Sequence, residues 1–158
     1  MLGQVEREQL KSDLILPWII VIMMLVMLAA AIMACHIAGG QLQQHLPHDQ
    51  RELIRTILYA VAIVAFPLTN LIRHIQLRLN QTMPGDKSAK NRYLLTVTVS
   101  AALIESVGIF GFVMFILGDD FNTLYIFTGL SALGLFLYRP KPDEYYDIVE
   151  ARNAQKQE

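Results

Sequence analysis

The chain has 158 residues and a formal net charge of −1; 54% of its residues are hydrophobic and only 17% are charged. A water-soluble domain usually has about 25% charged residues, and the excess apolar residues here lie in long uninterrupted runs. Composition therefore excludes an ordinary soluble domain, and the lack of a basic stripe interleaved with aromatic residues argues against a nucleic-acid-binding protein.

Four apolar runs follow one another along the chain. A helix needs about 20 apolar residues to cross a bilayer, and alternating barrel strands are absent. We therefore expect an all-α polytopic membrane protein with four transmembrane helices in two antiparallel hairpins. It would form a single membrane domain over residues 1–158 that ends in a polar cytoplasmic tail at 139–158. The predicted spans cover residues 14–38, 54–74, 93–118 and 121–138.

Lysine and arginine placement predicts the orientation, because cytoplasmic segments are enriched in both. The first loop carries only Arg51 and Arg55, and the turn between the third and fourth runs carries neither lysine nor arginine. The other segments between or beside the runs are basic: Arg7, Lys11, Arg73, Arg78, Lys87, Lys90, Arg92, Arg139, Lys141, Arg152 and Lys156. This alternation predicts that both ends are cytoplasmic, in a bacterial inner membrane.

Glu105 is the one acidic residue inside the third run, about 18 Å along the helix from Tyr93. That depth is close to the bilayer centre, where a charge costs several kcal/mol. We expect Glu105 either to be protonated or to face a polar partner inside the bundle, and an intramembrane acid is also a candidate ion-binding group. The side chains that could bond to it are Ser131, Thr128, Asn70 and Thr69.

Small residues are spaced along one face of each of the last two runs, which predicts close packing between them. Ala101, Gly108 and Gly111 lie on or near the helix face of Glu105, and Gly129 and Gly134 lie in the fourth run. The connection at residues 118–120 is too short for anything but an antiparallel hairpin. Its two aspartates, Asp119 and Asp120, are typical of a helix cap, with cation binding as the alternative.

Residues 102–113 read Ala-Leu-Ile-Glu-Ser-Val-Gly-Ile-Phe-Gly-Phe-Val. This stretch resembles the carboxylate helix of the proteolipid c subunit of rotary ATPases, and it likewise follows a polar loop, here with Arg78 and Pro84. The resemblance implies that Glu105 is an ion-carrying carboxylate. The family's glycine-rich first helix is replaced by alanines at residues 60–65, so we expect a c-subunit-like hairpin in another membrane assembly rather than a rotor ring.

Cys35, His36, His45 and His48 gather at the outer end of the first run, and thiolate and imidazole suit zinc or copper. Their spacing matches no zinc motif, and an ordinary polar loop is the favoured interpretation. No nucleophile–base pair, phosphate loop or dinucleotide fingerprint is present, so we expect no enzyme and no cofactor.

Together these features predict a small non-enzymatic membrane protein, a structural or accessory subunit of a membrane protein complex. Its expected partners are the lipid bilayer and either other membrane subunits or further copies of itself, with no nucleic acid. One alternative is proton or cation translocation through Glu105 in a c-subunit-like hairpin. A second alternative is metal handling at the outer end of the first run.

Overall fold

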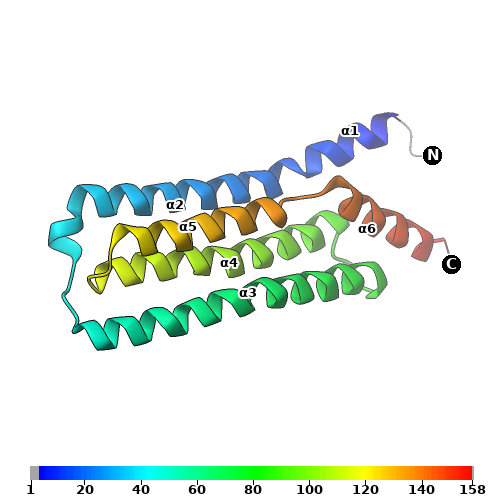
Figure 1. Ribbon diagram of the computed structural model, residues 1–158. Helices are drawn as coiled ribbons and strands as arrows, with labels where there is room; N and C mark the ends of the chain where they lie inside the picture. The colour runs from blue at the N-terminus through cyan, green and yellow to red at the C-terminus, as the bar shows by residue number, and fades with distance from the viewer. Residues whose placement is uncertain (1–3, 158) are drawn as a thin grey trace.

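The computed structural model describes residues 4–157, and this part of the chain is helical with short connections and no strand (Figure 1). The all-α prediction is confirmed for the described residues. The helices are α1 (Gln4–Asp13), α2 (Ile15–Leu42), α3 (His48–Thr82), α4 (Ala89–Ile116), α5 (Phe121–Leu137) and α6 (Pro142–Gln155).

Three helical segments are long and apolar enough to cross a membrane: residues 6–42, α3 and α4. A fourth is reached if α5 and α6, which are bent by 44° at the break between them, count as one span. Both α2 and α3 expose large apolar side chains, for example Ile37 at 81% and Ile63 at 72%. Exposure of this kind suits lipid, so the helices fit a multi-pass membrane protein.

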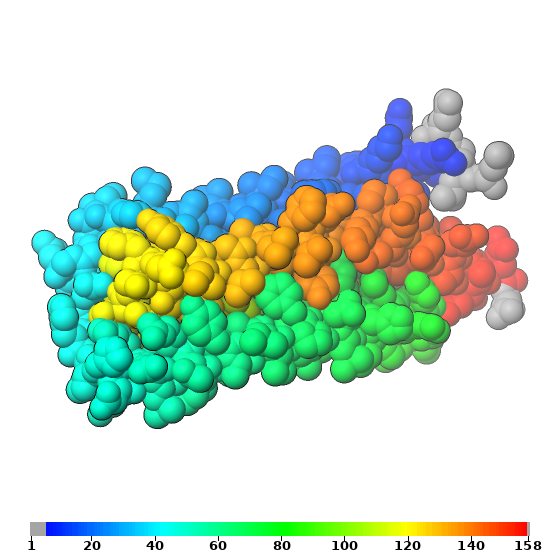
Figure 2. All heavy atoms as spheres, in the orientation of Figure 1, coloured from blue at the N-terminus to red at the C-terminus, as the bar shows by residue number. Residues whose placement is uncertain are grey.

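Helix α4 is the centre of the bundle, and α2, α3 and α5 all pack against it. Its side chains Val97, Ile104, Val107 and Met114 are completely buried. In the space-filling view, α5 lies between α2 and α3 (Figure 2). Helices α1 and α6 and the α3–α4 loop lie at one end of the bundle, and the α2–α3 loop and the α4–α5 turn lie at the other (Figure 1).

The expectation of two separate antiparallel hairpins needs a correction, because the closely packed consecutive pairs are α3 with α4 and α4 with α5. Although α2 and α3 follow one another in the chain, they make few contacts with each other and both pack on α4. The loop at residues 43–47 crosses the end of the bundle and is bonded to the α4–α5 turn, with Gln44 N donating to Ile116 O at 2.6 Å. The loop thus holds α2 and α3 on separate sides of the central helix.

Local sequence signals account for the ends of the last two long helices. Ser88 caps α4 by accepting from Asn91 N, and Asp120 caps α5 by accepting from Thr123 N, as its position in the sequence indicated. Gly118 has φ +95, a left-handed conformation that only glycine adopts without strain, and it makes the tight α4–α5 turn possible.

The structure gives more helix than the apolar runs predict. Helix α3 extends beyond the predicted 54–74 at both ends, since its polar ends lie outside the apolar stretch but continue the same hydrogen-bond ladder. The predicted polar tail at 139–158 is also largely helical in its described part. It forms α6, which folds back against α3 and α4 and buries Tyr145 and Ile148.

Candidate functional site

Glu105 lies on the buried side of α4 and is only 8% exposed. It shares its helix face with Ala101 and Gly108, and Gly108 lies directly against Leu28 of α2 and Ser131 of α5. The carboxyl group is therefore near the place where three helices meet, within a long apolar stretch of α4.

Glu105 forms no hydrogen bond with any residue among 4–157. Its Oε2 atom is buried and without a partner, whereas its Oε1 atom is not fully enclosed by the bundle. An unsatisfied buried polar atom is costly, and in native structures it usually marks a group with a partner or task of its own. Within residues 4–157 the site is thus a single carboxyl group without a polar partner.

The four side chains expected to bond with Glu105 are engaged elsewhere or point away. Ser131 Oγ donates to Ile104 O at 3.0 Å, Thr128 Oγ1 to Leu124 O at 2.7 Å, and Thr69 Oγ1 to Ala65 O at 2.7 Å. Asn70 is exposed. Hydroxyl groups in apolar helices commonly bond to the carbonyl four residues earlier. These local hydrogen bonds use the hydroxyl groups that the sequence suggested as partners of Glu105.

Three of the small residues singled out in the sequence lie at close helix contacts. A Cβ at Gly111 would lie 2.8 Å from Phe127 Cβ, and one at Gly134 would lie 2.5 Å from Ile104 Cγ2; Gly108 is tighter still. Ala101 is also buried, at 2% exposure. Gly129 differs from the expectation, because it is exposed and a Cβ there would meet nothing within 4 Å.

The four candidate metal ligands are not brought together. Cys35 is fully buried in a cluster with Phe115 and Leu124. His36 bonds to Tyr125 OH at 2.7 Å and stacks on Phe121, while His45 and His48 are exposed. Within residues 4–157 no group of three or more histidine, cysteine, aspartate or glutamate side chains could hold a metal ion. The metal alternative therefore has no geometric site in the described part of the chain.

A polar network at the end of the bundle that holds α6 was missed by sequence reasoning. Arg73, only 4% exposed, binds Glu144 with an Nη2–Oε2 distance of 2.7 Å, and Tyr93 OH donates to the same carboxylate at 3.1 Å. Arg73 and Glu144 are 71 residues apart in the chain. No local spacing could signal such a pair, and Arg73 was identified only as a basic flank of its helix.

A second group of contacts ties α6 to the α1–α2 junction. Tyr145 OH donates to Asp13 Oδ2 at 2.8 Å, and Lys90 Nζ lies 3.1 Å from Asp13 Oδ1. Burial raises the pKa of the Tyr145 phenol, and both the hydrogen bond and the charge of Asp13 raise it further. Tyr145 lies in the tail that the sequence places outside the membrane.

We expect the docking of α6 to weaken as the pH rises. Because the pKa of Tyr145 is higher in the folded protein, its stabilising effect is complete below the ordinary tyrosine value of about 10 and is lost above it. The melting temperature in detergent should therefore fall more between about pH 8 and about pH 11 in the wild type than in Tyr145→Phe. Parallel melting curves for the two proteins would contradict this.

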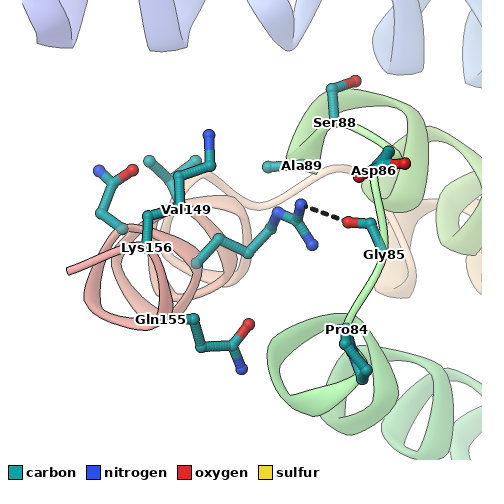
Figure 3. A pocket seen from close by; sticks show the side chains of 10 residues that line it. Pro84, Gly85, Asp86, Ser88, Ala89, Val149, Gln155 and Lys156 are labelled. Carbon is teal, nitrogen blue, oxygen red and sulfur yellow. Dashed lines mark hydrogen bonds between the residues drawn. The ribbon is translucent and has the colours of Figure 1, made fainter. Parts of the chain in front are cut away.

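A hollow of about 560 Å³ lies at the same end, between α6 and the α3–α4 loop (Figure 3). The dashed line in Figure 3 marks the bond from Arg152 Nη2 to Gly85 O, at 2.9 Å. Gln155 Nε2 likewise donates to Gln81 O at 2.9 Å. Since both side chains are used to attach α6 to the neighbouring backbone, the hollow belongs to the docking of α6.

Comparison of the chain with protein-family models, with curated protein sequences and with solved structures finds no match.

Proposed function

We propose that the chain crosses a bacterial inner membrane four times, with both ends in the cytoplasm. The support is the charge pattern: the basic segments all belong to the end that carries α1, α6 and the α3–α4 loop. Helix α5, with 17 residues and a length of about 25 Å, is long enough to be the fourth span by itself. Helix α6 begins with Asp143 and Glu144 and would lie at the cytoplasmic surface.

Cysteine accessibility tests this topology in intact cells. A cysteine in place of His45 should react with a membrane-impermeant maleimide from outside, and one in place of Lys87 should react only after the membrane is opened. Because native Cys35 is fully buried, it contributes little background. Labelling of residues 45 and 87 from the same compartment would overturn the proposed topology.

We further propose that the protein is a non-enzymatic subunit of a membrane protein complex. The observation that carries this proposal is the unpartnered Glu105 oxygen, buried in a bundle whose neighbouring hydroxyls are all satisfied. Glu105 finds no hydrogen-bond partner among residues 4–157. A neighbouring polypeptide that reaches the accessible Oε1 of Glu105 supplies a hydrogen-bond partner, which lipid tails cannot do.

Crosslinking in native membranes tests the subunit proposal. A short photocrosslinking side chain that does not depend on reactive amines, placed at exposed apolar positions of the bundle, should give covalent products heavier than the 17.9 kDa chain. Glu105→Gln keeps the shape and the hydrogen-bonding capacity of the side chain, so these products should persist in that variant. Recovery of the chain only as an uncrosslinked monomer from every position would contradict the proposal.

Proton or cation translocation through Glu105 is the second candidate, favoured by the same free carboxyl. A group that binds and releases ions needs an oxygen that is not committed to a fixed partner and can be reached, and Glu105 Oε1 meets both conditions. In proteoliposomes with a pH-sensitive dye inside, wild-type protein should then carry flux that Glu105→Gln abolishes. Ser106→Ala is the matched control on the next residue, and equal flux in wild type and Glu105→Gln would overturn this candidate.

A further inference from the structure

The end of α3 that is proposed to face the cytoplasm continues the exposed apolar side of this helix. Val64 and Leu68 are exposed, and Leu71, Ile75 and Leu79 follow them at 55%, 47% and 44% exposure. Their spacing of four, three, four and four residues keeps all five on one side of the helix. The apolar surface thus runs on past residue 74, where the predicted span ends. We call these five residues the exposed stripe of α3.

Arg78 is an exposed cation at the edge of this stripe, three residues after Ile75. Its guanidinium group makes no hydrogen bond or ion pair with any residue among 4–157. Residues 53–85 contain no aspartate or glutamate, so no carboxylate on this part of α3 can neutralise it. The donors of Arg78 are therefore free within the described chain.

The rest of the protein covers a different side of α3. Arg73 binds Glu144 of α6 on that side, and Leu77 packs against the cluster that contains Tyr145. Arg73 and Arg78 are five residues apart, which places them about 140° from each other around the helix axis. The docking of α6 therefore leaves Arg78 and the exposed stripe uncovered.

The depth of Arg78 follows from two neighbouring spans. At about 1.5 Å per residue, Arg78 lies about 6 Å past the end of the α3 span at residue 74. Asn80 Nδ2 donates to Thr96 Oγ1 at 2.9 Å, so this turn of α3 is level with the start of the α4 span at residue 93. The head-group layer is about 5–7 Å thick on each side of the hydrocarbon. Arg78 thus lies at the level of the lipid phosphates.

The phosphate of an anionic phospholipid matches both properties of this surface. A guanidinium group binds phosphate oxygens through paired, charge-assisted hydrogen bonds, while the acyl chains of the same lipid cover Ile75 and Leu79. A soluble phosphate would satisfy Arg78 but leave the apolar side chains in water. A zwitterionic lipid carries its own ammonium group, which competes for the phosphate, whereas a net negative lipid adds attraction to a basic side chain.

We propose that Arg78 and the exposed stripe of α3 bind an anionic phospholipid of the cytoplasmic leaflet, with the guanidinium group on the lipid phosphate and the acyl chains along Ile75 and Leu79. The inference rests on the proposed topology and adds a lipid class and a binding site to it.

Photocrosslinking in proteoliposomes tests the site. Phosphatidylglycerol with a diazirine near the top of its acyl chain should label residues 75–79 about fivefold more than phosphatidylcholine with the same diazirine at equal mole fraction. Leu53 and Ile57, exposed near the other end of α3, are the internal control and should be labelled equally by the two lipids. Equal labelling of 75–79 by the two lipids, or the same preference at both ends, would overturn the proposal.

Two charge variants show whether Arg78 is the cause. Arg78→Gln should abolish the preference for phosphatidylglycerol at 75–79. Lys156→Gln is the matched control, since it removes an exposed positive charge from the end of α6 and should leave the preference unchanged. Loss of the preference in both variants would indicate a general effect of charge and contradict a site at Arg78, as would a preference that persists in Arg78→Gln.

Two further results separate the possible sources. Inorganic phosphate at constant ionic strength should not reduce the preference, and a loss on its addition would show that soluble phosphate occupies the site instead of lipid. The topology is tested separately by maleimide labelling of residues 45 and 87. Labelling from opposite sides of the membrane, together with equal crosslinking by the two lipids, would overturn this inference and leave the topology intact.

Discussion

Replacing Gly111 with alanine is expected to lower the free energy of unfolding by about 1–3 kcal/mol. The new Cβ would lie 2.8 Å from Phe127 Cβ and 3.0 Å from Leu124 O. Because one of these neighbours is backbone, rotation of a side chain cannot relieve the clash, and α4 and α5 have to move apart. The loss exceeds the roughly 0.5–1 kcal/mol that alanine gains over glycine in a helix.

The measurement can use the chain's own cysteine. Cys35 is fully buried, so a thiol-reactive dye reports unfolding as the protein is heated in detergent. Gly129→Ala is the matched control, since nothing lies within 4 Å of a Cβ there; it should melt at the wild-type temperature or slightly above. If Gly111→Ala melted together with Gly129→Ala, close contact between α4 and α5 at this position would be refuted.

Replacing Arg73 with methionine should detach α6 and destabilise the protein by about 3–5 kcal/mol, the usual effect of removing one partner of a buried ion pair. Arg73 is 4% and Glu144 19% exposed, so the remaining carboxylate would be left largely out of water. Tyr93 OH, which donates to the same carboxylate, would not compensate for the lost charge. The measurement is maleimide labelling of Ile148→Cys, a position that is fully buried while α6 is docked.

Two further variants show whether charge is the cause. Arg73→Met combined with Glu144→Met removes both charges and should recover much of the lost stability. Lys90→Ala breaks the more exposed pair with Asp13, whose side chains are 44% and 31% exposed, and should cost at most about 1 kcal/mol. An Arg73→Met protein with residue 148 as protected as in the parent would show that α6 stays docked without the Arg73–Glu144 ion pair.

The sequence by itself determined the long apolar helices, because helical backbone in lipid follows from the length of an apolar run and needs no knowledge of the neighbours. It also determined the short α4–α5 connection, because Gly118 and the Asp120 cap affect only residues next to them in the chain. Glu105 stood out for the same reason, since an acid in the middle of an apolar helix is conspicuous without any structure. Close contacts at Gly108 and Gly111 followed the small-residue pattern.

Apart from the α4–α5 hairpin, only the tertiary structure decided which helices meet. The apolar runs of α2 and α3 do not specify a neighbour, because lipid and helix are equally apolar, and the packing of both on α4 depends on the shapes of their surfaces. The docking of α6 through Arg73 and Glu144 joins residues 71 positions apart, beyond any local pattern. The isolation of Glu105 also escaped the sequence, because the hydroxyls that could have reached it bond to backbone carbonyls instead.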